Sequence, residues 1–336
     1  MRTAPTLDDV AKRAGVSTAT VSRCVNAPER VHKDTRERVE AAIAALGYAP
    51  NFGARVMAAK RTFTIGAVIP TMENAIFARG LQAFQDVLRE RGYTLIVASS
   101  AYRPDLEEEQ IRKLIARGAD GLLLIGEDRS DDVNDFLRER NVATVAAWTY
   151  PQTGRFPCVG FDNRKAMRAL AAEVIALGHR RIGYISGVID GNDRAQLRLS
   201  GLKDALAEAG VDWTAPPLIE TPYDIDGGGD AFERLMATEA PPTAIMCGND
   251  VLAVGALMRA REMKMRAPED VSITGFDDLE IARIVEPPLA TVHVPHREMG
   301  EEAARALIDL IEGRGDGAPV EVSTALRLRR SLGAPP

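Results

Sequence analysis

Apolar runs of four to six residues alternate with longer amphipathic stretches over residues 64–276. Amphipathic stretches with a helical period, such as 76–91 and 250–264, separate most of these runs. Strands that are apolar along their whole length and alternate with helices are typical of parallel sheets covered on both faces. The predicted strands cover residues 64–69, 94–99, 121–125, 142–147, 158–161, 182–186, 244–247 and 271–276. With crossovers near residues 161 and 290, they predict two doubly wound lobes between which the chain passes three times.

The first 46 residues predict three short helices and no strand, at 7–14, 18–26 and 33–46. Gly15 separates the first two helices, and Ser17 is in position to cap the second. Two helices joined by a tight glycine-containing turn, with a third to complete a core, describe a helix-turn-helix. A generic three-helix bundle shares this outline, so geometry alone leaves both interpretations open.

The second of these helices has two different faces. Val21 and Val25 lie four residues apart and are predicted to face the core. The opposite face then carries small and polar side chains with one arginine, a surface that fits the major groove of DNA. These outward residues are Thr18, Ala19, Ser22 and Arg23.

The net charge of −6 conceals an uneven distribution. Residues 1–61 hold 11 Lys/Arg and 6 Asp/Glu, a net charge of +5, whereas the remaining residues hold 31 and 42, a net charge of −11. A basic segment on an acidic body predicts a polyanionic partner for the N-terminal part alone. A solvated basic face is the alternative that charge by itself leaves open.

Other features exclude several classes of protein. Cys24, Cys158 and Cys247 form no C-x-x-C pair, so we expect three buried, reduced thiols and neither a disulfide framework nor a metal site. No stretch approaches the roughly 18 apolar residues of a membrane span, and the N-terminus lacks an apolar export segment. We therefore expect a cytoplasmic protein without a membrane partner.

The run TLDDVAKRAGVSTATVSRCVN, followed by TRERVEAAIAALGYAPN, resembles the DNA-binding headpiece of the LacI family. The segments CGNDVLAVGAL, ITGFDDLEIARIVEPPLATV and LRLSGLKDAL resemble effector-domain motifs of that family, so the resemblance spans about residues 6–330. It implies a helix-turn-helix domain at 1–50, a hinge at 51–63, and a periplasmic-binding-protein-like core of two lobes at 64–336 that binds effector and dimerises. It also implies a transcriptional regulator, a repressor rather than an activator, that acts as a homodimer on a palindromic operator.

The resemblance and the exposed helix face together predict the DNA contacts. We expect Arg23 to bind a guanine through two hydrogen bonds, with Thr18 and Ala19 against the neighbouring base. In the family a hinge leucine enters the minor groove; this chain carries Met57 instead, an apolar side chain that can serve as the same wedge or only pack the hinge. The predicted set is Ser17, Thr18, Ala19, Thr20, Ser22, Arg23, Asn26, Thr35, Asn51, Arg55 and Met57.

Ligands of open parallel sheets bind beyond the carboxyl ends of the strands. Aromatic residues follow the predicted strands there, mixed with carboxylates, amides and an arginine, a combination that suits a sugar ring and its hydroxyls. The resemblance implies effector contacts for Arg198, Asn249 and Asp277, and it puts aromatic and ligand-lining residues at four further positions. The predicted set is Phe77, Trp148, Phe161, Asp162, Arg198, Asn249 and Asp277. For each polar residue among them, helix capping is the competing interpretation.

The segments GFDN at 160–163 and YRP at 102–104 are similar to gluconate-responsive members of the family. The expected effector is therefore a carbohydrate, whether a sugar, a sugar acid or a phosphosugar. A sugar acid is favoured because Arg198 can pair with a carboxylate.

Catalytic motifs are missing from the sequence. It has no phosphate-binding P-loop, no G-x-G-x-x-G after a strand, no H-E-x-x-H and no G-x-S-x-G. The triplet Gly227-Gly228-Gly229 follows a polar turn and is predicted to be a loop before the next helix. We expect no catalysis and no cofactor. A periplasmic sugar-binding protein would share the two lobes, but it would need an export signal in place of the helix-turn-helix.

Overall fold

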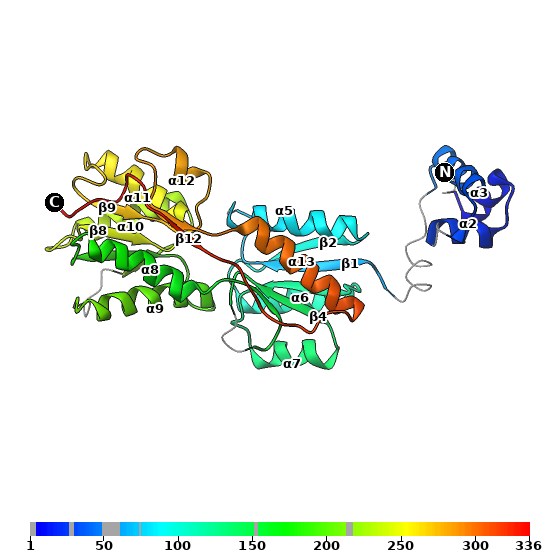
Figure 1. The fold of residues 1–336 in the computed structure, drawn as a ribbon, viewed down its shortest axis with the longest axis horizontal. Helices are drawn as coiled ribbons and strands as arrows, with labels where there is room; N and C mark the ends of the chain where they lie inside the picture. Colours follow the sequence, from blue (N-terminus) through cyan, green and yellow to red (C-terminus); the bar gives the residue numbers. More distant parts are fainter. Residues whose placement is uncertain (1–4, 27–29, 49–60, 74, 151–153, 213–217) are drawn as a thin grey trace. The chain divides into compact units, whose positions relative to one another are not determined.

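The computed structural model describes residues 5–26, 30–48, 61–73, 75–150, 154–212 and 218–336. The chain divides into two compact units, residues 1–62 and 63–336 (Figure 1). Most of the predicted hinge lies outside the described residues, so the proposed boundaries at 50 and 63 stay predictions.

The N-terminal unit has its three helices where the sequence predicts them: α1 (Leu7–Ala14), α2 (Thr18–Asn26) and α3 (Lys33–Leu46). The Thr6 side chain caps α1 by accepting a hydrogen bond from the Asp9 N–H, and Gly15 ends the helix with a left-handed φ of 66°.

The core of this unit differs from the prediction at one position. Val10, Val21 and Val39 are fully buried in it. Val25 is half-buried, and Cys24 occupies the inner position in its place. Residues 21 and 24 share a helix face as readily as residues 21 and 25 do, and packing against α1 and α3 selects the former pair.

Lobe 1 is built on a six-stranded parallel sheet in the order β11-β5-β4-β3-β1-β2. The strands are β1 (Thr64–Ile69), β2 (Thr94–Ser99), β3 (Gly121–Ile125), β4 (Ala143–Ala147), β5 (Cys158–Gly160) and β11 (Val320–Glu321). Alternate strand residues face opposite sides: Ile65 and Leu123 lie in one hydrophobic cluster, Val68 and Leu122 in another. Its helices are α5 (Ala75–Glu90), α6 (Pro104–Ala116), α7 (Asp131–Glu139) and α13 (His296–Glu312).

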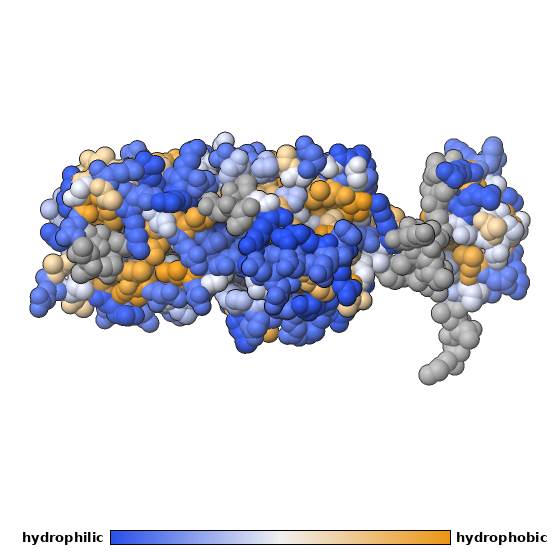
Figure 2. All heavy atoms as spheres, turned by 90° about the horizontal axis from the view of Figure 1, so that it is seen from below, coloured by the Kyte–Doolittle hydropathy of each residue, from blue (hydrophilic) through white to orange (hydrophobic). Residues whose placement is uncertain are grey.

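Those helices cover both faces of the sheet. Phe84 of α5 and Met299 of α13 belong to the first cluster, and Ile111 of α6 and Leu137 of α7 to the second. The outer side of α7 is exposed, and Figure 2 shows that the surface around it is mainly hydrophilic. This two-sided covering accounts for the uninterrupted apolar strands in the sequence.

Lobe 2 holds a four-stranded parallel sheet in the order β7-β6-β8-β9, with strands β6 (Ile182–Ser186), β7 (Leu218–Glu220), β8 (Ala244–Cys247) and β9 (Ser272–Thr274). Helices α8 (Asn163–Ala176) and α9 (Asp193–Glu208) pack on one face, and α10 (Ile225–Met236) and α11 (Asp250–Glu262) on the other. The short α12 (Ile281–Ile284) follows β9.

The prediction for the glycine triplet is wrong, because Gly227, Gly228 and Gly229 lie inside α10. A side chain at Gly228 would come within 2.3 Å of the Leu252 backbone oxygen, and one at Gly255 within 2.0 Å of the Ile225 oxygen. The glycines therefore let α10 and α11 pack at close range. The sequence alone suggested a loop here because glycine is unfavourable inside an isolated helix.

The chain passes between the lobes three times, the number that the sequence predicts: after β5, at β10 (Thr291–His293), and between β11 and β12 (Ala325–Arg327). Strands β10 and β12 pair antiparallel at the crossover. The prediction of two doubly wound parallel lobes is confirmed. Four short strands, β7, β10, β11 and β12, were not predicted.

The three cysteines are buried and free, as expected. Within the described part of the chain, no helix is long and apolar enough to cross a membrane.

Candidate functional site

The predicted DNA-contacting face of α2 is open to solvent. Thr18, Ala19 and Arg23 are exposed, and Ser22 is half-buried. The Ser17 hydroxyl accepts a hydrogen bond from the Thr20 N–H at 3.2 Å and lies 2.9 Å from the Thr20 hydroxyl. Ser17 thus caps α2, and the helix presents one arginine among small polar groups.

Thr35 is half-buried in the first turn of α3. The other predicted DNA contacts cannot be placed: the side chain of Asn26 and the whole of Asn51, Arg55 and Met57 lie outside the described residues. Their roles stay predictions.

The carboxyl-terminal parts of the lobe 2 strands, the residues that follow them and the first residue of α13 in lobe 1 carry buried polar atoms, which we call the polar chamber. Within the described part of the chain, none of these atoms makes a hydrogen bond. Buried polar groups are nearly always paired, so such a group of exceptions at one place points to a site for a polar ligand. The atoms are Tyr184 OH, Ser186 Oγ, Asn249 Nδ2, Thr274 Oγ1, Asp277 Oδ1, Asp277 Oδ2 and His296 Nε2.

Arg198 of α9 is held rigidly beside these atoms. Its Nε donates to Asn163 Oδ1 at 2.9 Å, and its Nη1 donates to the Gly248 carbonyl at 2.6 Å. The guanidinium lies 3.9 Å from the centroid of the Phe276 ring, within the range of a cation–π contact. Arg198 is therefore oriented in advance, with Nη2 directed towards Asp277.

Asp277 is fully buried and has a left-handed φ of 107°, an uncommon conformation for a residue with a side chain. Its Oδ1 lies 3.7 Å from Arg198 Nη2, an ion pair without a hydrogen bond. Burial raises the pKa of Asp277 to about 6, and the charge of Arg198 limits that rise. A carboxylate with both oxygens free to accept hydrogen bonds suits a ligand rich in hydroxyl groups.

Aromatic side chains line the same region from both lobes. Phe161 stacks on Phe276 with ring centroids 6.0 Å apart, and Phe77 meets Trp148 edge-on at 5.5 Å. All four rings are buried. The three predicted aromatic residues, together with Phe276, thus form two pairs.

Asn249 combines two roles. Its Oδ1 caps α11 by accepting from the Leu252 N–H at 2.9 Å, which leaves Nδ2 as a donor in the polar chamber. Asp162 differs, because it caps α8 through the Lys165 N–H at 2.9 Å and lines a separate hollow with Lys165 and Ser323. The capping interpretation therefore describes Asp162, whereas Asn249 both caps and faces the predicted ligand.

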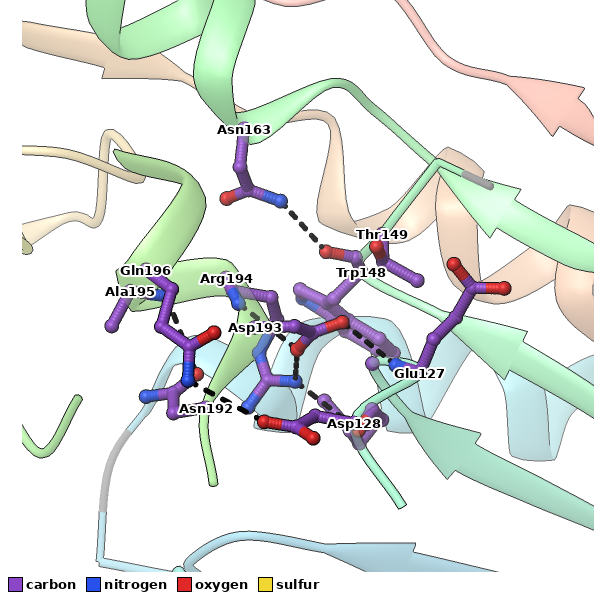
Figure 3. A network of polar contacts seen from close by, with 12 residues as sticks. Glu127, Asp128, Trp148, Thr149, Asn163, Asn192, Asp193, Arg194, Ala195 and Gln196 are labelled. Carbon is purple, nitrogen blue, oxygen red and sulfur yellow. Dashed lines mark hydrogen bonds and ion pairs between the residues drawn. The ribbon is translucent and has the colours of Figure 1, made fainter. Parts of the chain in front are cut away.

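The two lobes are joined by polar contacts at the N-terminus of α9 (Figure 3). Asp193 Oδ2 accepts from the Glu127 N–H at 2.7 Å, and Arg194 Nη1 donates to the Ile125 carbonyl at 3.2 Å. Gly126 lies between them, where an added Cβ would be 2.0 Å from Arg194 Nη1. The lobes are closed on each other at this point.

Sequence reasoning missed Tyr184, Ser186, Thr274 and His296 of the polar chamber. Ser186 ends a predicted strand and Thr274 lies near the end of another, so the rule that ligands bind beyond carboxyl ends could have included them. Nothing local marks Tyr184, which lies inside β6, or His296, which joins the lobe 2 residues only through the packing of the lobes.

Two family models match the chain. Residues 6–51 match bacterial regulatory proteins of the lacI family, and residues 171–332 match a periplasmic binding protein-like domain. The HTH-type transcriptional repressor PurR of Erwinia tasmaniensis is 34% identical over 330 residues, which cover 97% of this chain and 96% of that protein.

Two solved structures are similar over nearly the full length. The transcriptional regulator CelR–cellobiose complex is 31% identical with a TM-score of 0.72, covering 97% of this chain and 99% of that one. The lac repressor dimer bound to operator and the anti-inducer ONPF is 27% identical with a TM-score of 0.86, covering 99% and 100%.

Proposed function

The chain belongs to the LacI family of bacterial regulatory proteins and is a DNA-binding transcriptional repressor; we propose that a carbohydrate bound between its lobes controls it. It is not an enzyme, since the relatives it matches are repressors. We further infer that it acts as a homodimer on a palindromic operator in the cytoplasm. One similar structure is an operator-bound dimer, which supports this inference.

The polar chamber is the observation that carries the effector proposal. Tyr184, Ser186 and Thr274 supply hydroxyls that can donate or accept, Asn249 supplies a donor, and Asp277 supplies two acceptors. Sugar hydroxyls also donate and accept, so a carbohydrate can pair with such a mixed set. The buried aromatic pairs supply the apolar surface against which a sugar ring packs.

Arg198 supports a sugar acid among the carbohydrates. Its guanidinium is buried, and its one charged neighbour in the chamber, Asp277, lies beyond hydrogen-bond distance. A ligand carboxylate could share this guanidinium and form charge-assisted hydrogen bonds with it. A similar regulator has been solved with cellobiose, so a neutral sugar is the nearest alternative.

Control of DNA binding would work through linkage. An effector that contacts both lobes favours the closed arrangement, and closure biases the hinge that precedes β1. The coupling must be reciprocal, so operator DNA changes effector affinity by the same factor as effector changes operator affinity.

The test combines DNA and ligand binding on the full chain. Operator is selected from a randomised palindromic pool, and its affinity is measured with and without D-gluconate, cellobiose and guanine. We expect one of the two carbohydrates to shift operator affinity at least fivefold. A shift with guanine alone would replace the carbohydrate assignment by a purine.

A further inference from the structure

Tyr102 lies in the loop between β2 and α6 with an unusual backbone. Its φ is +58°, and that of the preceding Ala101 is +50°. Bulky side chains seldom adopt left-handed backbone conformations, and such conformations are concentrated at functional sites. The backbone of this loop is therefore strained at Tyr102, and contacts elsewhere in the fold must offset the conformational energy of holding the side chain in this position.

The Tyr102 ring reaches across to lobe 2. It stacks on Tyr223 with ring centroids 5.1 Å apart and an interplanar angle of 24°. The Tyr223 ring is also packed against Gly187, where an added Cβ would lie 2.1 Å from Cζ of the ring. Asn192 Nδ2 donates to the Tyr223 hydroxyl at 3.3 Å. Tyr223 is thus fixed by lobe 2, and Tyr102 is the lobe 1 partner that closes against it.

Tyr102 lies near the polar chamber, because the Tyr223 ring on which it stacks packs against Gly187, the residue after Ser186. Burial raises the pKa of the Tyr102 phenol above the usual value, the nearby Tyr223 adds to the rise, and the charges of Arg194 and Arg198 oppose it. Asp277 acts on the same phenol. Tyr102 is therefore an uncharged hydroxyl close to the charged pair that is predicted to hold the effector.

The tyrosine pair also lies between two hollows at the lobe interface. One is lined by Ser100, Tyr102 and Arg194. The other, of about 450 Å³, is lined by Arg79 of lobe 1 and by Tyr223 and Leu279 of lobe 2. Each tyrosine thus lines one of the two hollows.

We propose that Tyr102 is an effector-contacting residue that determines specificity, its phenol hydrogen-bonding a cyclic polyol or its acid while its ring and Tyr223 form one aromatic wall. The inference rests on the proposed function and deepens it. Six of the seven atoms of the polar chamber come from lobe 2, the exception being Nε2 of His296. A hydroxyl from the lobe 1 loop would make effector affinity depend on closure of the lobes.

The test measures effector affinity by calorimetric titration of D-gluconate and cellobiose into the full chain and its variants. Tyr102→Phe keeps the ring and removes one hydrogen bond, so we expect affinity for the bound sugar to fall about three- to tenfold. Tyr102→Ala removes the wall as well, and we expect a loss of more than tenfold and a changed ratio between the two sugars. Tyr93→Phe is the matched control, because the Tyr93 ring packs against Phe63 and lines neither hollow; it should bind as wild type does.

Arg198→Ala separates the possible failures. If it abolishes binding while both Tyr102 variants bind like wild type, Tyr102 is not a contact and the proposed site stands. If neither sugar binds the wild-type chain, the carbohydrate assignment fails and this inference fails with it. The thermal unfolding midpoint of each variant shows whether the chain has folded.

Discussion

The indole Nε1 of Trp148 donates a hydrogen bond to Nδ1 of His296 over 3.1 Å, and both side chains are buried. Because Nδ1 accepts, the neutral imidazole carries its proton on Nε2. Burial lowers the pKa of His296 to about 3, so this tautomer persists throughout the physiological range. Trp148 thereby makes His296 Nε2 a hydrogen-bond donor at the edge of the polar chamber.

Trp148→Phe should destabilise the fold, since it leaves a buried imidazole nitrogen without its donor. We expect a loss of about 1–3 kcal/mol in the free energy of unfolding, measured by urea denaturation. His296→Phe and the double variant complete a thermodynamic cycle. Additive effects of the two substitutions would mean that the hydrogen bond contributes nothing to stability.

Effector affinity should depend on pH through Asp277. Its pKa in the fold is about 6 against a usual 3.8, because burial disfavours the charged form. The raised value means that the Asp277 contribution to stability is complete below pH 3.8 and is lost as pH rises through about 6. Binding of hydroxyl donors requires the ionised form, so affinity should fall as pH drops from 7.5 to 5.

Asp277→Asn provides the control for this pH profile. It keeps one acceptor oxygen and cannot ionise, so affinity should be more than tenfold lower at pH 7.5 and nearly flat with pH. A variant with the wild-type profile would assign the titration to another group.

Gly126→Ala should weaken closure of the lobes. The added methyl group would lie 2.0 Å from Arg194 Nη1 and 2.3 Å from Asp193 Oδ1, which contact lobe 1 at this point. Gly92→Ala is the matched control, with a φ of +77° against +76° and no atom within 4 Å. We expect a larger radius of gyration in X-ray scattering and weaker effector binding for Gly126→Ala only. Equal behaviour of the two variants would attribute the effect to backbone strain alone.

Arg23→Ala should cost about 1–3 kcal/mol in affinity for the selected operator and relax specificity at one base pair. Loss of Arg23 should affect non-specific DNA much less, because phosphate contacts come from several basic residues. Arg138→Ala, which replaces an exposed arginine of α7 in lobe 1, controls for net charge.

A fragment from residue 64 onward should not bind DNA. The operator affinity of the full chain should fall steeply as salt concentration rises, in spite of the net charge of −6.

Met57 is predicted to unstack the central step of the operator. Met57→Ala should lower operator affinity by about 1–3 kcal/mol and weaken the preference for a flexible central step. Met57→Leu should hold or raise affinity, because leucine is the more rigid wedge. Titrations on operators with altered central steps measure both. If Met57→Ala keeps the wild-type operator affinity and the wild-type preference for the central step, Met57 only packs the hinge.

Local patterns in the sequence determined the helices of the N-terminal unit, the apolar strands and the two-lobed class. Helix caps, helical periods and apolar strands involve neighbours within about four residues. Ser17, Gly15 and the run 64–69 could therefore be recognised from the sequence as a helix cap, a helix end and a strand. Residue types at strand ends likewise pointed to Arg198, Asn249 and Asp277.

Only the tertiary structure decided the relationships between residues distant in the chain. Tyr102 meets Tyr223 because the two lobes pack against each other, and Trp148 meets His296 because α13, which follows a crossover, packs beside β4 within lobe 1. Close packing of α10 on α11 required glycine at positions 228 and 255, and the sequence suggested a loop at the first of these. Such contacts depend on how whole helices and strands are positioned. The residues around either partner therefore show no local spacing or period that would predict the contact.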